Sequence, residues 1–183
     1  MSIAYTNRLG TQVYLHKRMT KSGSTRFVFA RELDAVDAVD EIPDGYEIHE
    51  SVHGRVTLRK PPRRYITELE ELLVQRGLRT EPYLRRCRYE LKGKLLEIFE
   101  PGAPTLNQNY EAVMRFELLD ANTRSFRVDR MCYKSWKDGW MEVGRGPLAQ
   151  LASSYLPHVT RSSFYELWDG DPLPPVGGPG TRF

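Results

Sequence analysis

The sequence predicts an α+β fold: a small N-terminal antiparallel β module, then a larger antiparallel sheet with a preceding helix and one or two C-terminal helices. Two segments in the first 60 residues alternate apolar and polar side chains around turn residues. A capping-box pattern at residues 67–70 opens a stripe of leucines with helical spacing. Four more alternating segments lie between residues 85 and 133. We expect domains at 1–60 and 61–168, followed by a Pro/Gly-rich tail at 169–183.

The first hairpin is predicted from period-2 alternation on both sides of a loop at residues 17–24. Its core face is expected to hold Val13, Leu15, Phe27 and Phe29. An acidic connector follows, and Pro43-Asp44-Gly45 closes it as a turn. The second hairpin covers residues 46–50 and 55–59, with Tyr46, Ile48, Val56 and Leu58 inward. Together the two hairpins are expected to make one four-stranded sheet.

The remainder of the chain is predicted as a helix, a sheet and closing helices. Residues 59–64, Arg-Lys-Pro-Pro-Arg-Arg, form a stiff basic linker, because proline cannot continue a strand ladder. The capping box at Thr67 starts a helix that Gly77 should end. Strands are expected at 85–91, 94–99, 111–119, 124–133 and around 140–143. Gly146-Pro147 opens another helix, Ser163 begins a short third one, and the tail has linker composition.

Composition indicates an ordinary soluble chain of 183 residues, and we expect it to be cytoplasmic, with no cofactor and no metal. No apolar run approaches the ~20 residues that a membrane span requires. Cys87 and Cys132 are 45 residues apart and belong to no Cys/His cluster, so both are predicted to be free thiols. Glycine loops that bind phosphate and common hydrolase motifs are also missing from the sequence.

Charge is segregated in the first third of the chain. Residues 1–30 hold five basic residues and no acid, and residues 31–50 hold one basic residue and eight acids. Aromatic side chains beside cations on a sheet face fit nucleic acid, because cations neutralise phosphates and rings stack on bases. The candidate nucleic-acid-binding residues are Tyr14, His16 and Arg26 on the outer face of the hairpin, with Lys17, Arg18 and Lys21 in or beside its loop. Alternatively, these cations pair with the acids of the connector at residues 34–41.

The first 60 residues resemble a family of uncharacterised bacterial proteins. The resemblance rests on Tyr5-Thr6-Asn7-Arg8 with Gly10, Tyr14-Leu15-His16, Thr20-Lys21 with Gly23, Pro43 with Gly45-Tyr46-Glu47, and Leu58-Arg59-Lys60. It implies a module boundary near residue 60 and a bacterial origin, and it adds no catalytic residue.

Two other functions compete with nucleic-acid binding. Trp136 and Trp140 flank a turn and could contact a protein partner, or they could cover the core of the C-terminal sheet. Glu90 and Lys92 match the E-x-K half of a nuclease metal site that Asp120 or Asp129 would complete, although Lys92 falls in an expected turn. On the C-terminal strands Arg115, Glu117, Arg127 and Asp129 interleave, which is typical of cross-strand salt bridges.

The sequence therefore predicts a non-enzymatic binding or accessory module with nucleic acid as the leading partner. A protein-interaction subunit of a larger bacterial assembly is the first alternative, and a metal-dependent nuclease is the second.

Overall fold

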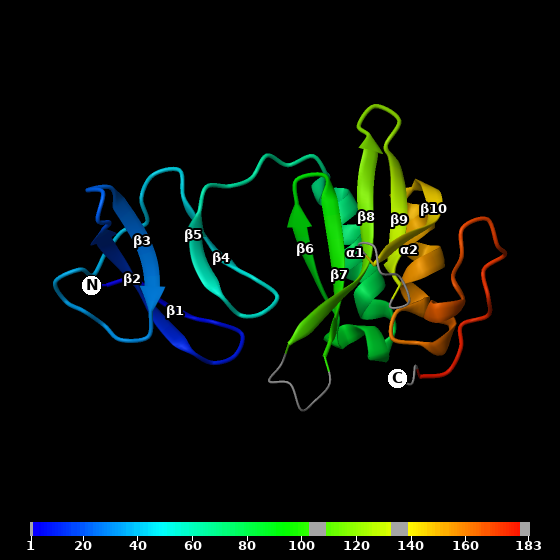
Figure 1. Cartoon of the computed structure of the whole chain (residues 1–183), viewed down its shortest axis with the longest axis horizontal. Helices are drawn as coiled ribbons and strands as arrows, with labels where there is room; N and C mark the ends of the chain where they lie inside the picture. Colours follow the sequence, from blue (N-terminus) through cyan, green and yellow to red (C-terminus); the bar gives the residue numbers. More distant parts are fainter. Residues whose placement is uncertain (1, 103–108, 133–138, 180–183) are drawn as a thin grey trace. The chain divides into compact units, whose positions relative to one another are not determined.

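Two units make up the chain, Met1–Pro62 and Arg63–Phe183. The computed structural model describes residues 2–102, 109–132 and 139–179, and Figure 1 shows the order of their helices and strands. Antiparallel sheets and helices together give an α+β fold, as the sequence predicts. In the described residues, no helix is both long and apolar enough to cross a membrane.

Unit 1 contains two separate small sheets, where the sequence predicted a single four-stranded one. The first sheet has the order β1 (Ala4–Thr6), β2 (Gln12–Met19), β3 (Thr25–Ala30), and the second pairs β4 (Glu47–Glu50) with β5 (Val56–Arg59). Strand β1 was not expected, because three residues are too few to show alternation. It pairs antiparallel with the first half of β2.

The turn after β1 joins the two sheets of unit 1. The Asn7 side chain accepts hydrogen bonds from the backbone N–H groups of Leu9 and Thr11, which shapes the turn, and its amide donates to the carbonyl of Gly54 at 2.8 Å. The Arg8 backbone N–H donates to the Glu50 carboxylate at 2.9 Å. The β4–β5 hairpin is therefore held to the β1–β2 turn by side chains that satisfy buried backbone groups.

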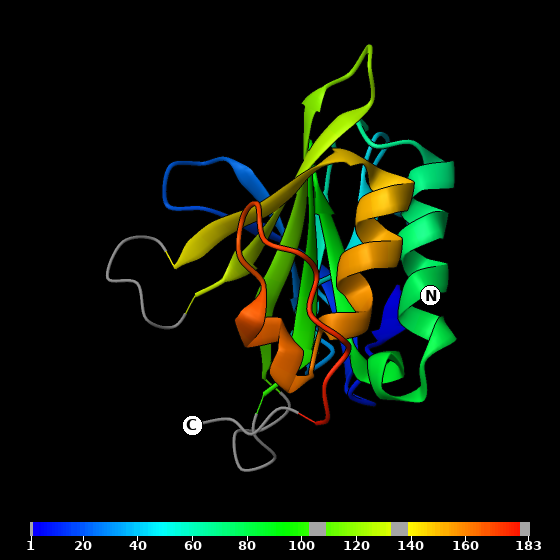
Figure 2. The same cartoon turned by 90° about the vertical axis from the view of Figure 1, so that its right-hand side faces the viewer.

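Unit 2 is a five-stranded antiparallel meander with both helices on one face (Figure 2). Its order along the chain is α1 (Glu68–Thr80), η1 (Pro82–Arg86), β6 (Arg88–Lys92), β7 (Leu95–Pro101), β8 (Tyr110–Asp120), β9 (Ser125–Met131), β10 (Trp140–Pro147), α2 (Leu148–Tyr155), η2 (Leu156–His158) and η3 (Ser162–Glu166). Sheet neighbours follow chain order from β6 to β10, so every connection is short.

The core of unit 2 lies between the sheet and the helices. Alternate residues of the central strands point inward and are fully buried, among them Met114, Phe116, Phe126 and Val128. Helices α1 and α2 contribute Val74, Leu78, Leu148, Leu151 and Ala152 to the same cluster. The predicted capping box is confirmed, because the Thr67 side chain accepts from the Glu70 N–H while the Glu70 carboxylate accepts from the Thr67 N–H.

Three predictions about element ends are wrong. Helix α1 runs through Gly77 to Thr80, and strand β6 begins at Arg88 because the 3₁₀ helix η1 occupies residues 82–86. Ser163 caps no helix: its hydroxyl accepts from the Gly177 N–H and lies 3.0 Å from Nδ1 of His158. The described part of the tail is therefore not a free linker, since Gly178 also accepts from the Ser162 N–H at 2.9 Å.

Candidate nucleic-acid interface

The β2–β3 register places the candidate binding residues on the faces that alternation predicts. His16 lies opposite Val28, Arg18 lies opposite Arg26, and cross-strand partners share a face. Tyr14 belongs to that face too, opposite Ala30. Lys17 belongs to the other face, opposite Phe27.

His16 is not exposed, which corrects the sequence prediction. Its side chain is 0% exposed, because the acidic connector lies against it: the Asp34 N–H donates to Nε2 of His16 at 3.0 Å. Backbone bonds hold the connector along β2, from Lys17 N–H to the Asp37 carbonyl at 2.8 Å and from Val39 N–H to the Leu15 carbonyl at 3.0 Å. Tyr14 is half-buried on the same face. Tyr14 and His16 thus offer little surface for stacking on bases.

The four cations of the hairpin remain on the surface. Lys17, Arg18, Lys21 and Arg26 are exposed, and within the described residues none of them lies in an ion pair with a carboxylate. The connector is attached to the hairpin by backbone bonds and by His16, not by these charges. Salt bridges between the hairpin cations and the connector acids are therefore absent from the described structure.

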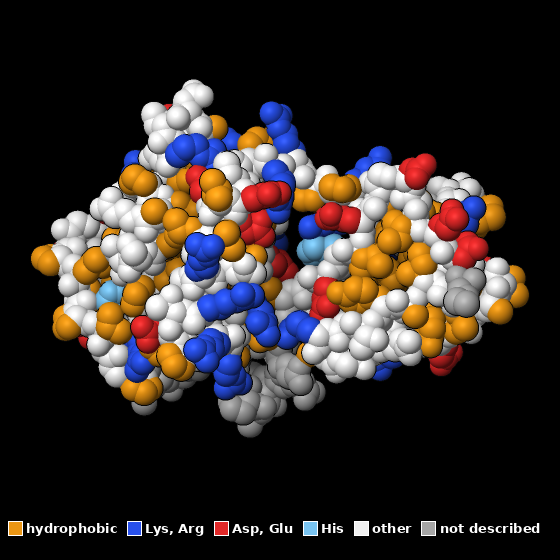
Figure 3. Space-filling model, turned by 180° about the vertical axis from the view of Figure 1, so that it is seen from behind, with side chains coloured by type: hydrophobic (Ala, Val, Ile, Leu, Met, Phe, Trp, Pro, Cys, Tyr) orange, Lys and Arg blue, Asp and Glu red, His pale blue; other side chains and the backbone are white. Residues whose placement is uncertain are grey.

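The face predicted to be the core of unit 1 forms an open groove of about 730 Å³. Val13 and Leu15 are buried, as expected. Phe27, Phe29, Val56 and Leu58 are only half-buried, and Tyr46 keeps 36% of its surface exposed. Hydrophobic side chains are visible on the surface of unit 1 in Figure 3. The groove has the size of sites that take small molecules or single bases, roughly 300–1,000 Å³.

Aromatic rings and cations meet in this groove. The Phe27 and Tyr46 rings lie 6.3 Å apart between centroids at an angle of 53°, and the Lys60 ammonium lies 5.9 Å from the centroid of the Tyr46 ring. Arg26, Arg31 and Arg55 also line the groove, and no Asp or Glu is found among its described lining residues. We name this surface, formed by Arg26, Phe27, Phe29, Arg31, Tyr46 and Arg55, the basic aromatic groove.

Sequence reasoning assigned the groove aromatics to the core because alternation identifies which residues share a face. It does not show whether another element covers that face. Each hairpin in unit 1 is short, and within the described residues of the unit no helix packs on the concave side. The signal that could have identified the groove is the excess of aromatic side chains over a layer able to cover them.

The outer face of the unit 2 sheet is neutralised by its own charges. Arg115 pairs with Asp129, and Arg127 pairs with Glu117 and Asp129, which confirms the predicted cross-strand salt bridges. Trp140 lies on this sheet with the Arg115 guanidinium 4.5 Å from its ring centroid, so the ring is already partly covered. Trp136 lies outside the described residues. The structure thus gives the candidate partner-binding pair no free apolar patch at Trp140.

The E-x-K pair lies within a cluster of surface ion pairs. Lys92 lies 3.1 Å from Glu90 and 2.8 Å from Glu97, and both contacts raise the Lys92 pKa against the opposing effect of burial, which lowers it. Among the described residues, no group of three His, Cys, Asp or Glu side chains could hold a metal ion.

Comparisons with protein-family models, curated proteins and solved structures find nothing similar to this chain. The resemblance of the first 60 residues to a bacterial family therefore stays a prediction, and the function rests on the geometry alone.

Proposed function

We propose that the chain is a non-enzymatic binding module for single-stranded nucleic acid, which binds in the basic aromatic groove. The observation that supports this most is the joint presence of half-exposed rings and three arginines in a groove with no described acid. Unpaired bases offer flat faces to aromatic side chains, and each stacked base contributes about 1–3 kcal/mol. Duplex bases are already stacked on each other and would not enter.

Charge in and beside the groove suits a short stretch of backbone. Arg26, Arg31 and Arg55 line it, and Lys17 lies on the same face of the hairpin as Phe27. Three or four phosphate contacts give a plot of log K against log salt with a slope of about −2 to −3 for a single strand. The outer-face cations Arg18 and Lys21 can add weaker, longer-range attraction.

Fluorescence anisotropy with labelled 12-nucleotide single strands of mixed sequence, titrated with the full-length chain at several salt concentrations, tests the proposal. Phe27→Leu keeps an apolar side chain but removes the ring, so binding should weaken at least about 5-fold at every salt concentration. Arg26→Gln should instead flatten the salt slope by about 0.7. A blunt 12-base-pair duplex should bind much more weakly than either strand.

Arg145→Gln is the matched charge control, because Arg145 is exposed but already paired with Glu142. It should leave both affinity and slope unchanged. Circular dichroism of each variant establishes that it is folded. The proposal is wrong if wild-type protein binds no strand at low salt, or if Phe27→Leu binds as tightly as the wild type.

A further inference from the structure

The described arginines of unit 2 divide into a neutralised group and an unpaired group. On the sheet side, Arg115, Arg127 and Arg145 each pair with a carboxylate. At the end of α1 and along η1, five exposed arginines have no ion pair within the described residues: Arg76, Arg79, Arg85, Arg86 and Arg88. Figure 3 shows Lys and Arg side chains gathered on the helix-bearing side of unit 2. We name these five residues the arginine cluster.

The arginine cluster carries an uncompensated positive charge. Glu81 is the one acid between residues 76 and 88. The carboxyl end of α1 adds the equivalent of about half a negative charge, which offsets only a small part of five guanidinium groups. Five cations kept close together repel one another, and an anionic ligand relieves that repulsion.

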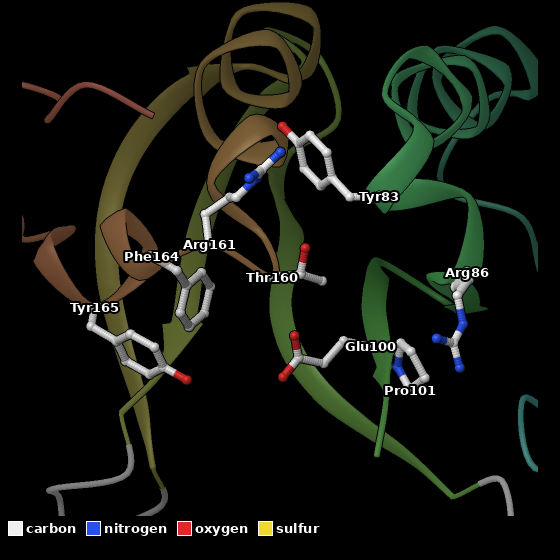
Figure 4. A pocket seen from close by; sticks show the side chains of 8 residues that line it. All are labelled: Tyr83, Arg86, Glu100, Pro101, Thr160, Arg161, Phe164 and Tyr165. Carbon is white, nitrogen blue, oxygen red and sulfur yellow. The ribbon is translucent and has the colours of Figure 1, made fainter. Parts of the chain in front are cut away.

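A pocket of about 200 Å³ opens beside Arg86. Figure 4 shows the Glu100 carboxylate in this pocket, between Arg86 on one side and the rings of Phe164 and Tyr165 on the other. A cavity of about 150 Å³ can hold a benzene ring, so this one admits a single base. The Phe164 and Tyr165 rings meet edge to face with centroids 5.6 Å apart and form an aromatic wall.

Two features of the pocket are typical of a binding site. Thr160 lines it with φ of 68°, a left-handed conformation that β-branched residues rarely adopt outside functional sites. Arg161 stacks on Tyr83, 3.7 Å from the ring centroid, and its Nε is buried with no hydrogen-bond partner in the described structure. Glu100 itself is only 8% exposed.

The buried carboxylate decides between ligand classes. An acidic peptide would place its carboxylates against Glu100, where like charges repel, and a free amino acid would use one arginine of the five. A nucleotide strand puts a neutral base in the pocket and its phosphates on the arginine cluster. Guanine alone among the bases presents two adjacent N–H donors, N1–H and the N2 amino group, which match the two oxygens of a carboxylate.

We infer that this pocket and the arginine cluster form a second nucleic-acid site, which selects guanine through Glu100 and holds the adjoining phosphates on Arg86 and its neighbours. The site lies wholly within unit 2. It does not depend on the basic aromatic groove, and each site can fail without the other.

Titration calorimetry with guanosine 5′-monophosphate and uridine 5′-monophosphate tests the pocket. Uracil has one N–H between two carbonyl oxygens, which Glu100 repels, so the guanine nucleotide should bind at least about 10-fold more tightly. Glu100→Gln keeps the shape of the side chain and should abolish that preference, whereas Glu97→Gln on the sheet side should keep it. A preference that survives Glu100→Gln, or its absence in the wild type, overturns the inference.

Oligonucleotide binding tests the arginine cluster. In the triple variant Arg79→Gln, Arg85→Gln, Arg86→Gln the slope of log K against log salt should fall by about 0.7 for each phosphate that the protein no longer neutralises. The matched triple variant Arg115→Gln, Arg127→Gln, Arg145→Gln should keep the wild-type slope in those assays where circular dichroism shows it folded; Arg145→Gln alone serves otherwise. An unchanged slope in the first triple variant overturns the role of the cluster. Phe27→Leu separates the two sites, since it should leave the guanine preference intact.

Discussion

Single buried polar residues attach distant segments to each unit. Arg130 is 3% exposed, and its guanidinium donates to the carbonyls of Leu167 at 2.6 Å and Tyr165 at 3.3 Å, so it holds η3 against β9. Burial lowers the pKa of Arg130, with Cys132 acting in the opposite direction. His16 has the corresponding role for the connector of unit 1. Each satisfies backbone groups that would otherwise be buried without a partner.

His158 should make stability depend on pH. Burial is the main cause that lowers its pKa below the ordinary value of about 6.5, and Glu166 raises it in part. The unfolded chain therefore takes up the proton first as pH falls. Unfolding free energy should be fully present above about pH 6.5 and decrease as pH falls from there toward the lowered pKa of the folded state.

Urea denaturation at several values between about pH 5 and 7.5 measures this effect. His158→Gln should flatten the dependence in that window even though it lowers stability overall, whereas His53→Gln, at an exposed position, should not. An equal slope in wild type and His158→Gln would assign the dependence to other groups.

The two cysteines should differ in reactivity. Burial raises the pKa of Cys87 to about 12, and the nearby Glu100 carboxylate adds to the shift. Its thiol stays protonated and covered, while Cys132 is partly exposed. Ellman's reagent at about pH 8 should titrate one thiol in the native protein and two after unfolding. Cys132→Ser should remove the native reaction, and a fast native reaction in that variant would contradict the burial of Cys87.

At the scale of elements, helix packing explains why α1 continues past Gly77. A Cβ at residue 77 would lie 2.7 Å from Cδ1 of Leu156, so glycine lets the η2 residue approach the helix backbone. Leu156 is 2% exposed and has little room to move. The glycine is therefore a contact point between elements inside α1, where the sequence pattern resembled a helix end.

A double-mutant cycle measures this contact. Gly77→Ala should destabilise the native protein by about 1–3 kcal/mol through overpacking. In the Leu156→Ala background the same change should stabilise by about 1 kcal/mol, because alanine is the better helix former and the clash is gone. Denaturant unfolding gives all four free energies. Additivity of the two changes would show that residues 77 and 156 do not interact.

At the scale of the whole molecule, the chain has two units with opposite designs. Unit 2 closes its core with two helices over five strands and buries complete aromatic side chains such as Phe116 and Phe126. Unit 1 has short strands, no helix in its described residues, and rings left half-exposed in the basic aromatic groove. The less covered unit should be the less stable one.

Limited proteolysis should separate the units. Residues 60–64 are exposed and belong to no strand or helix, and trypsin does not cleave between Lys60 and Pro61. First cleavage is expected after Arg63 or Arg64, leaving fragments of residues 1–63 or 1–64 and the remainder, identified by intact mass. The tail after Trp168, which is hydrogen-bonded to residues 162–163, should resist longer than the linker. Loss of both units together with no intermediate would show that they unfold as one.

The sequence by itself determined the strands, the helix starts and the shared faces, because these depend on neighbours within a few residues. The alternation around Leu15 and Phe27 and the capping box at Thr67 are local signals of this kind, and both hold in the structure. They also predicted the cross-strand pairs of Arg115 and Arg127.

Only the tertiary structure decided which faces are covered and which charges are neutralised. His16 is buried because Asp34, 18 residues later, packs on it, and the groove stays open because no described segment of unit 1 returns to fill it. The pocket beside the arginine cluster likewise joins Arg86, Glu100 and Arg161 from three separate elements. Burial and electrostatic potential depend on contacts between segments far apart in the chain, and no local pattern records them.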